Sequence, residues 1–228
     1  MIFRIKGFDI EITLEESLKP VLTILNKAVF RSVVGNIIDN IAGIENNDIV
    51  IEEKGKILKY SKETICFTDY FNFDFNSKSI STSINKSLEL ILQNELDLYQ
   101  KVEIEMTRVK SILNEIAADI EFELISDYES ELPNLLKLFN YKINLEVYSK
   151  SFDKLILMIE IISYFHLSKV IVFINLKSNY TEKEILEIYK CCEYKKLIFL
   201  CIESREYDTI NTEINYCIDE DLIESGPF

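Results

Sequence analysis

Glycine, proline, tryptophan and histidine are scarce in this chain. Its 228 residues include 5 Gly, 3 Pro, 1 His and no Trp. So little glycine and proline excludes a collagen-like or low-complexity chain, in which these residues dominate. The single histidine, His166, excludes a metal centre built from several imidazoles, and any Ser or Cys triad would depend on that one residue.

The glycine motifs that bind phosphate are missing as well. Neither GxxxxGK[ST] nor GxGxxG occurs in the chain, and such glycines are what allow backbone N–H groups to approach a phosphate. After the apolar run at residues 21–25, where a phosphate loop would be expected, the chain continues with Asn26, Lys27 and Ala28. We therefore expect neither nucleotide binding nor nucleotide hydrolysis.

Positive charge is in the minority. The 25 Lys and Arg are outnumbered by 39 Asp and Glu, and the resulting net charge of -14 excludes a simple polybasic binder of nucleic acid or membrane. Phosphate binding must then be local or assisted by a metal. No uncharged run approaches the roughly 18 residues of a membrane span. The 5 cysteines lack CxxC spacing and lie mostly in apolar runs, which favours reduced thiols in a cytoplasmic protein.

Hydrophobic patterning predicts an α/β fold. Near-continuous apolar runs occur at residues 21–25, 170–175 and 197–203. They are separated by helical patterns, which is typical of a mostly parallel sheet covered on both faces. Thr181 and Glu184 have the spacing of a capping box at the start of one helix. Alternation predicts further strands at residues 8–12 and 143–148, and the segment 48–60 reads as a hairpin with its turn at residues 54–56.

The middle of the chain has a different pattern. Residues 79–124 contain no Gly or Pro, and their apolar residues recur at spacings of three and four, which predicts two long helices. A shorter helix follows, with Pro133 in its first turn. The sequence thus predicts an α/β head domain from residues 1–77 and 143–228, and a helical leg domain from residues 78–142.

Carboxylates are concentrated in one segment without an intervening Lys or Arg. They are Asp119, Glu121, Glu123, Asp127, Glu129 and Glu131. If the segment is helical, Asp119, Glu123 and Asp127 form one stripe, and a hard divalent cation would relieve their repulsion. Ca²⁺ accepts roughly six to eight oxygen ligands in irregular geometry. The spacing is not that of an EF-hand, because no Gly marks the sharp turn, and a solvated acidic surface is the alternative.

Basic residues form two small groups, Lys54 to Lys62 around the predicted hairpin and Lys27 with Arg31 at the first helix. A function in phosphate binding requires these groups to converge on one surface, most easily by oligomerisation. The alternative is an ordinary solvated edge that resists pairing with other strands.

Several stretches of sequence follow one another in a characteristic order. They are VLTILNKAVFRSVVGNI, ILKYSKETICFTDYFNFDFNSKSI, KVIVFINLKSNYTEKEI, and LIFLCIESREYDTI followed by CIDEDLI. In this succession, which covers most of the chain, they resemble the ring-forming accessory protein of spacer acquisition in type II-A CRISPR systems. That family binds DNA ends and lacks nuclease activity, and the short length of this chain resembles its compact branch.

The resemblance implies a head similar to a degenerate phosphate-loop NTPase, a protruding helical leg, and a homotetrameric ring through which duplex DNA is threaded. It implies Ca²⁺ held by acidic residues near the base of the leg, where the Asp119 to Glu131 segment falls. Sequence-independent contacts to DNA would come from Lys and Arg inside the ring. By position, the candidates for these contacts are Lys27, Arg31, Lys54, Lys56, Lys59, Lys78 and Lys86.

We therefore expect a non-enzymatic, Ca²⁺-dependent protein that binds double-stranded DNA ends as a homotetramer. It would work with the CRISPR integrase complex and the RNA-guided effector nuclease during spacer acquisition. Two alternatives stay open. One is a Mg²⁺- or Mn²⁺-dependent nuclease or phosphoesterase that uses the same carboxylates, and the other is a scaffold whose long helices pair with a protein partner.

Overall fold

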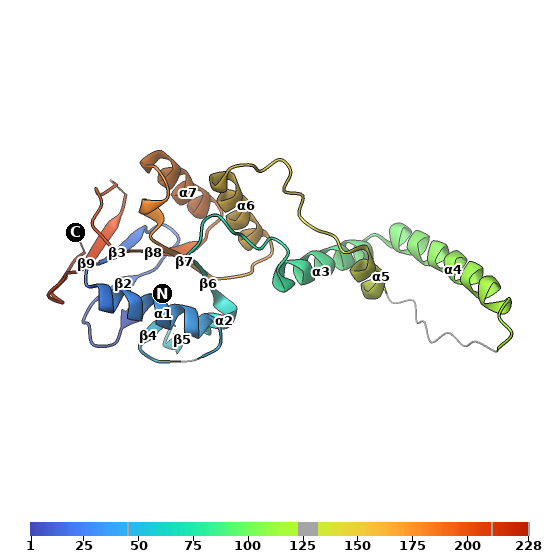
Figure 1. The fold of residues 1–228 in the computed structure, drawn as a ribbon, viewed down its shortest axis with the longest axis horizontal. Coiled ribbons are helices and arrows are strands. Elements are labelled where there is room, and N and C mark those ends of the chain that lie inside the picture. The colour runs from blue at the N-terminus through green and yellow to red at the C-terminus, as the bar shows by residue number, and fades with distance from the viewer. Residues whose placement is uncertain (45, 123–131, 211, 228) are drawn as a thin grey trace. The chain divides into compact units, whose positions relative to one another are not determined.

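The computed structural model describes residues 1–44, 46–122, 132–210 and 212–227. The chain divides into two compact units (Figure 1). The first consists of Met1–Phe73 and Leu145–Phe228, and the second of Asp74–Asn144. The first unit therefore combines both ends of the chain, and the second is a single insertion between them.

A six-stranded sheet, in the order β10-β9-β3-β8-β7-β6, forms the centre of the first unit. Its strands are β3 (Pro20–Ile24), β6 (Thr64–Phe67), β7 (Val170–Ile174), β8 (Ile198–Glu203), β9 (Ile214–Ile218) and β10 (Glu224–Ser225). Every neighbouring pair is parallel except β10 with β9. Because β7 is buried along its whole length, it reads in the sequence as an uninterrupted apolar run. The predicted α/β fold with a mostly parallel sheet is confirmed, whereas the likeness to a phosphate-loop NTPase stays a prediction.

A four-stranded antiparallel sheet, in the order β2-β1-β4-β5, lies in the same unit. Its strands are β1 (Ile2–Ile5), β2 (Glu11–Thr13), β4 (Ile49–Glu53) and β5 (Lys56–Ile57). Lys54 and Gly55 both have positive φ, at 51° and 79°, as a tight two-residue hairpin turn requires. The predicted hairpin is therefore confirmed, with its turn at the expected residues.

Helices cover both faces of the six-stranded sheet (Figure 1). On one face, α1 (Lys27–Ile41) contacts β3, β4 and β6. One hydrophobic core joins this helix to both sheets, as Phe3, Ile37 and Val172 illustrate. The opposite face is covered by α6 (Ser151–Tyr164) and α7 (Glu182–Tyr194), and a single 3₁₀ turn, η1 (Leu176–Ser178), precedes α7.

The start of α7 follows the sequence prediction. The hydroxyl of Thr181 accepts the Glu184 N–H, and the Glu184 carboxylate accepts the Thr181 N–H at 2.8 Å, so the capping box is confirmed. The hydrogen bonds from the Thr181 N–H and hydroxyl to the ionised carboxylate hold the pKa of Glu184 below its ordinary value.

The strand predicted at residues 143–148 is wrong. These residues contain no strand; the Tyr148 N–H donates to the Leu145 carbonyl in a turn, and Val147 is 77% exposed. Alternating apolar residues favour an extended chain, but a strand also needs a neighbour to take its backbone hydrogen bonds. No described strand pairs with this segment.

The second unit contains α3 (Lys78–Asn94), α4 (Leu96–Ala118) and α5 (Leu132–Phe139). Two long helices and a shorter one with Pro133 in its first turn were predicted, and all three are confirmed. Helix α3 contacts both α4 and α5. Helix α4 ends at Ala118, earlier than its sequence pattern indicated, and none of its side chains is buried by the described residues. None of the described helices is both long and apolar enough to cross a membrane.

Candidate functional site

The predicted acidic cluster is only partly described by the structure. Four of its members, Glu123, Asp127, Glu129 and Glu131, lie outside the described residues. Asp119 follows the last residue of α4 and donates its N–H to the Ile116 carbonyl, and both Asp119 and Glu121 are exposed. Helix α4 ends at Ala118, so Asp119 itself lies just beyond the helix. The conditional stripe of Asp119, Glu123 and Asp127 stays a prediction, because its other two members lie outside the described residues. In the described parts of the chain, no group of three or more His, Cys, Asp or Glu could hold a metal ion, and the calcium site stays a prediction.

The predicted DNA contacts occupy three places. Lys54 lies in the β4–β5 turn, Lys56 is the first residue of β5, and Lys59 directly precedes α2 (Tyr60–Glu63). Lys27 and Arg31 lie in the first two turns of α1, and Lys78 and Lys86 lie on α3 in the second unit. All seven side chains are exposed, and none forms an ion pair with another described residue.

Lysines gather along the hairpin and the start of α2. We call this surface the basic edge, and it consists of Lys54, Lys56, Lys59 and Lys62. The carboxylates of the same stretch are paired elsewhere. Glu52 contacts Arg4 at 2.6 Å, and Glu53 and Glu63 contact Lys169 at 3.2 and 2.7 Å. The ion pair with Lys169 also holds the pKa of Glu63 below its ordinary value. Arg4 also pairs with Glu11 and the one Lys169 ammonium serves two glutamates, so these carboxylates are only partly neutralised. None of them forms an ion pair with the four lysines of the basic edge.

Lys27 has less favourable surroundings. Asn26 caps α1 by accepting the N–H groups of Ala28 and Val29, and its side-chain amide donates to the Glu220 carbonyl at 3.0 Å. This bond brings the start of α1 beside the acidic turn at residues 219–221. Negative charge there weakens the attraction of Lys27 for phosphate, so the basic edge is the stronger of the two groups in this unit.

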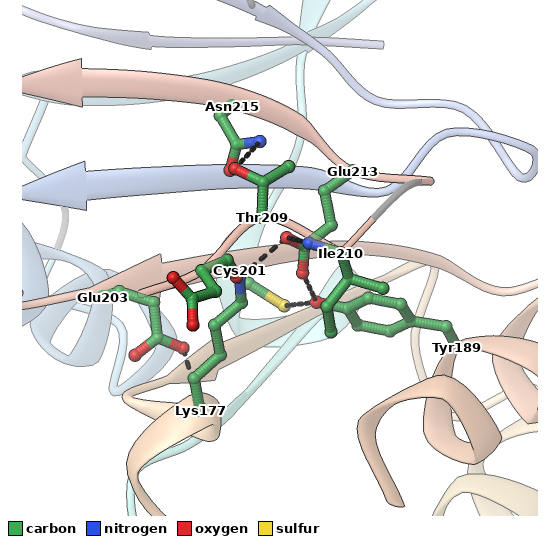
Figure 2. Close-up of polar contacts among 9 residues, drawn as sticks. Lys177, Tyr189, Cys201, Glu203, Thr209, Ile210, Glu213 and Asn215 are labelled. Carbon is green, nitrogen blue, oxygen red and sulfur yellow. Dashed lines mark hydrogen bonds and ion pairs between the residues drawn. The ribbon is translucent and has the colours of Figure 1, made fainter. Parts of the chain in front are cut away.

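A buried ion pair lies at the carboxyl end of the sheet, and no pattern in the sequence predicted it (Figure 2). The Lys177 ammonium lies 2.7 Å from Glu213 Oε2, and the two side chains are 4% and 0% exposed. The Tyr189 hydroxyl donates to Glu213 Oε1 at 2.7 Å, and the Ile210 N–H donates to Glu213 Oε2 at 3.0 Å. Lys177 also donates to the Asp208 carbonyl. Both charges are thus compensated, and the pair joins the 204–213 segment to η1 and α7.

Glu203, the last residue of β8, lies next to this pair and is fully buried. Its Oε1 accepts the Lys177 backbone N–H at 3.0 Å, whereas no described residue hydrogen-bonds its Oε2. Burial raises the pKa of Glu203 to about 7. Burial also raises the pKa of the Cys201 thiol, which touches the Tyr189 hydroxyl at 3.6 Å and is therefore an unreactive core group. We interpret the cluster as a structural brace, since it exposes no nucleophile.

The elevated pKa of Glu203 predicts a pH dependence of stability. The folded chain retains this proton to higher pH than the unfolded chain, so stability falls as the pH rises from about 4.5 to about 7. A rise in pKa from about 4.5 to about 7 corresponds to a loss on the order of 3 kcal/mol. We expect Glu203→Gln to remove most of this loss in urea unfolding followed by circular dichroism. Glu187→Gln, which removes an exposed carboxylate from α7, is the control, and equal pH profiles for both variants would contradict the prediction.

Comparison with known proteins connects these features to one family. The family model described as "CRISPR-associated protein (Cas_Csn2)" matches residues 43–222. A protein of Streptococcus agalactiae described as "CRISPR-associated protein Csn2" is 26% identical over 209 residues, which cover 90% of each chain. The match to the model includes the basic edge, the second unit and the buried ion pair. The resemblance inferred from the sequence is confirmed.

Proposed function

Because the chain belongs to the Csn2 family of CRISPR-associated proteins, we propose that it binds the ends of double-stranded DNA during spacer acquisition and catalyses no reaction itself. The basic edge carries this proposal. In a chain with a net charge of -14, four neighbouring lysines without an ion-pair partner among the described residues form a local positive surface. A surface of this kind suits a polyanion. Because the family is CRISPR-associated, we take DNA as that polyanion.

The proposed contacts are independent of DNA sequence. Lysine ammonium groups bind phosphates as point charges, whereas base readout depends mainly on the planar guanidinium of arginine. The basic edge contains no arginine, so affinity should depend strongly on salt and little on base composition.

Helix α4 supports the proposed homotetrameric ring. Its apolar residues Tyr99, Val102, Met106, Val109, Leu113 and Ile116 are spaced alternately by three and four. This is the pattern of a coiled-coil seam. The C-terminal half of this seam is uncovered by described residues, with Val109 49%, Leu113 59% and Ile116 61% exposed, whereas Val102 and Met106 are half-buried. A solvent-exposed apolar stripe of this length favours association, and we propose that copies of the chain associate through it.

Calcium is proposed to bind the carboxylates from Asp119 to Glu131. No Lys or Arg offsets their charge, and the carbonyl end of the α4 dipole adds partial negative charge where Asp119 and Glu121 begin the segment. A divalent cation would relieve both contributions. Calcium bound at the end of α4 would then influence how the chains assemble. The CRISPR integrase complex and the effector nuclease are the proposed partners of the assembled ring.

The test compares linear and circular DNA of one sequence. We expect the protein with Ca²⁺ to have the mass of four chains by light scattering and to bind a linear duplex. The same molecule closed into a covalent circle should not bind, because a ring loads over an end. Cutting the circle once should restore binding, which is the internal control. Equal binding of both forms would contradict end loading, and cleavage of either form with Mg²⁺ would favour the nuclease alternative.

A further inference from the structure

A cavity of about 260 Å³ lies beside the basic edge. It is partly open to solvent and is lined by the end of α1, the segment before β4, strand β5 and the start of α2. The residues that decide its chemistry are Asn40, Asn47, Ile57, Lys59, Tyr60 and Ser61. Its volume suits a small molecule or the terminal group of a larger one.

Two buried residues of the cavity wall have polar atoms without a hydrogen-bond partner among the described residues. Asn40 is 4% exposed, and its Oδ1 accepts the Asn46 N–H at 2.8 Å, but no described residue accepts from its Nδ2. Tyr60 is 6% exposed, and its hydroxyl also has no described partner. Leaving such buried groups without a hydrogen bond is unfavourable. Both atoms are shielded from solvent in this structure, so a ligand in the cavity can satisfy them only when the Asn40 and Tyr60 side chains turn toward it.

Donors outnumber acceptors among the free polar groups of the wall, where the Asn47 amide offers both a donor and an acceptor. Burial raises the pKa of Tyr60, which keeps its hydroxyl protonated, and Lys59 adds an ammonium and Ser61 a hydroxyl. Asn46, by contrast, is already engaged, since its Oδ1 accepts the Asp48 N–H. No carboxylate is among the described residues that line the cavity. Glu63, the acidic group in contact with the Lys59 backbone N–H, is paired with Lys169.

An excess of donors together with a cation selects a ligand that bears negatively charged oxygens. A phosphate monoester offers three acceptor oxygens and close to two negative charges at neutral pH, whereas an internal phosphodiester of DNA offers two oxygens and one charge. Ile57 is 59% exposed beside these donors and gives an apolar surface for the carbon skeleton of the ester. Lys59 belongs both to the cavity and to the basic edge.

We propose that this cavity binds a phosphate monoester, which under the function proposed above is the terminal 5′-phosphate of the DNA duplex. This inference rests on that function for the source of the ester. With the terminal phosphate on Lys59, the phosphates that follow along the strand lie toward Lys56 and Lys54. The protein would then recognise a DNA end by its terminal phosphate as well as by loading over the free end.

The experiment measures the affinity for 5′-phosphorylated and 5′-hydroxyl duplexes of one sequence. We expect the unmodified protein to prefer the phosphorylated end by about tenfold, since hydrogen bonds to charged groups are worth that much or more. Tyr60→Phe, which removes the hydroxyl and keeps the ring, should reduce this preference severalfold. The matched control is Thr64→Val, because Thr64 also has a buried hydroxyl without a described partner but does not line the cavity. This variant should keep the full preference.

A second measurement separates this proposal from the proposed function. Inorganic phosphate should raise the melting temperature of the unmodified protein and of Thr64→Val, but not that of Tyr60→Phe. If DNA binds equally well with either end and phosphate has no thermal effect, the cavity proposal is overturned and DNA binding stands. If DNA does not bind but phosphate protects in this variant-dependent way, the cavity is supported with a free phosphate ester as its ligand, and the proposed function fails. Absence of both responses overturns the cavity proposal.

Discussion

We expect Glu213→Gln to lower the free energy of unfolding of the α/β unit by about 3–5 kcal/mol, the range for breaking a buried ion pair. The carboxylate of Glu213 is the acceptor for three groups: the Lys177 ammonium, the Tyr189 hydroxyl and the Ile210 N–H. Glutamine removes the charge and leaves the Lys177 ammonium uncompensated at 4% exposure. Because whole domains are stable by about 5–15 kcal/mol, the loss would be a large fraction of the total.

Urea unfolding followed by far-ultraviolet circular dichroism is the measurement, since the chain has no Trp. The control is Asp48→Asn, which breaks the exposed pair with Lys6, in which the Lys6 and Asp48 side chains are 73% and 51% exposed. It should cost less than about 1 kcal/mol. The double variant Lys177→Met with Glu213→Leu removes both charges and should be milder than Glu213→Gln alone. If Glu213→Gln cost no more than Asp48→Asn, the pair would not be the brace that the contacts indicate.

The sequence predicted the elements whose cause is local. Strands β7 and β8 were recognisable because both of their faces are buried, and α7 because its capping box lies within four residues. The strand expected at residues 143–148 failed because pairing depends on a neighbour that the segment itself does not encode. The Lys177–Glu213 pair joins residues 36 positions apart. Each reads as an ordinary surface charge in its own segment, and burial becomes evident only when the two meet in the fold.

The basic edge was also predictable only in part from the sequence. Lysines 54, 56 and 59 are close in sequence, and the hairpin keeps them close in space. Whether their charge is free depends on distant residues. Arg4 contacts Glu52 from 48 positions away, and Lys169 contacts Glu53 from 116 positions away. Without these two partners the glutamates would compensate the lysines. The cavity beside Lys59 could not be predicted from the sequence either. Its donors come from α1 and α2, and strands β4 and β5 lie between these helices along the chain.

Reversing the charge of Lys54, Lys56 and Lys59 to glutamate should lower the affinity for linear duplex DNA by at least about 100-fold at moderate salt, because each lysine that neutralises a phosphate releases counterions. The slope of log affinity against log salt should also become shallower by roughly 0.9 for each phosphate that is no longer neutralised, or about 2.7 for three. Fluorescence anisotropy over a series of salt concentrations gives both quantities.

The matched control is the triple variant Lys150→Glu, Lys183→Glu and Lys190→Glu. It changes the net charge by the same amount but lies around α6 and α7, on the opposite face of the six-stranded sheet from α1 (Figure 1). If affinity followed total charge, both triple variants would weaken binding equally, and a local interface at the basic edge would be refuted. A lower affinity and a shallower salt slope in the basic-edge variant alone would support a local interface. The ion pairs of Glu52 with Arg4 and of Glu53 with Lys169 would then have a role in function. These pairs keep an acidic protein from neutralising its own basic edge, and the edge then stays open to a polyanion.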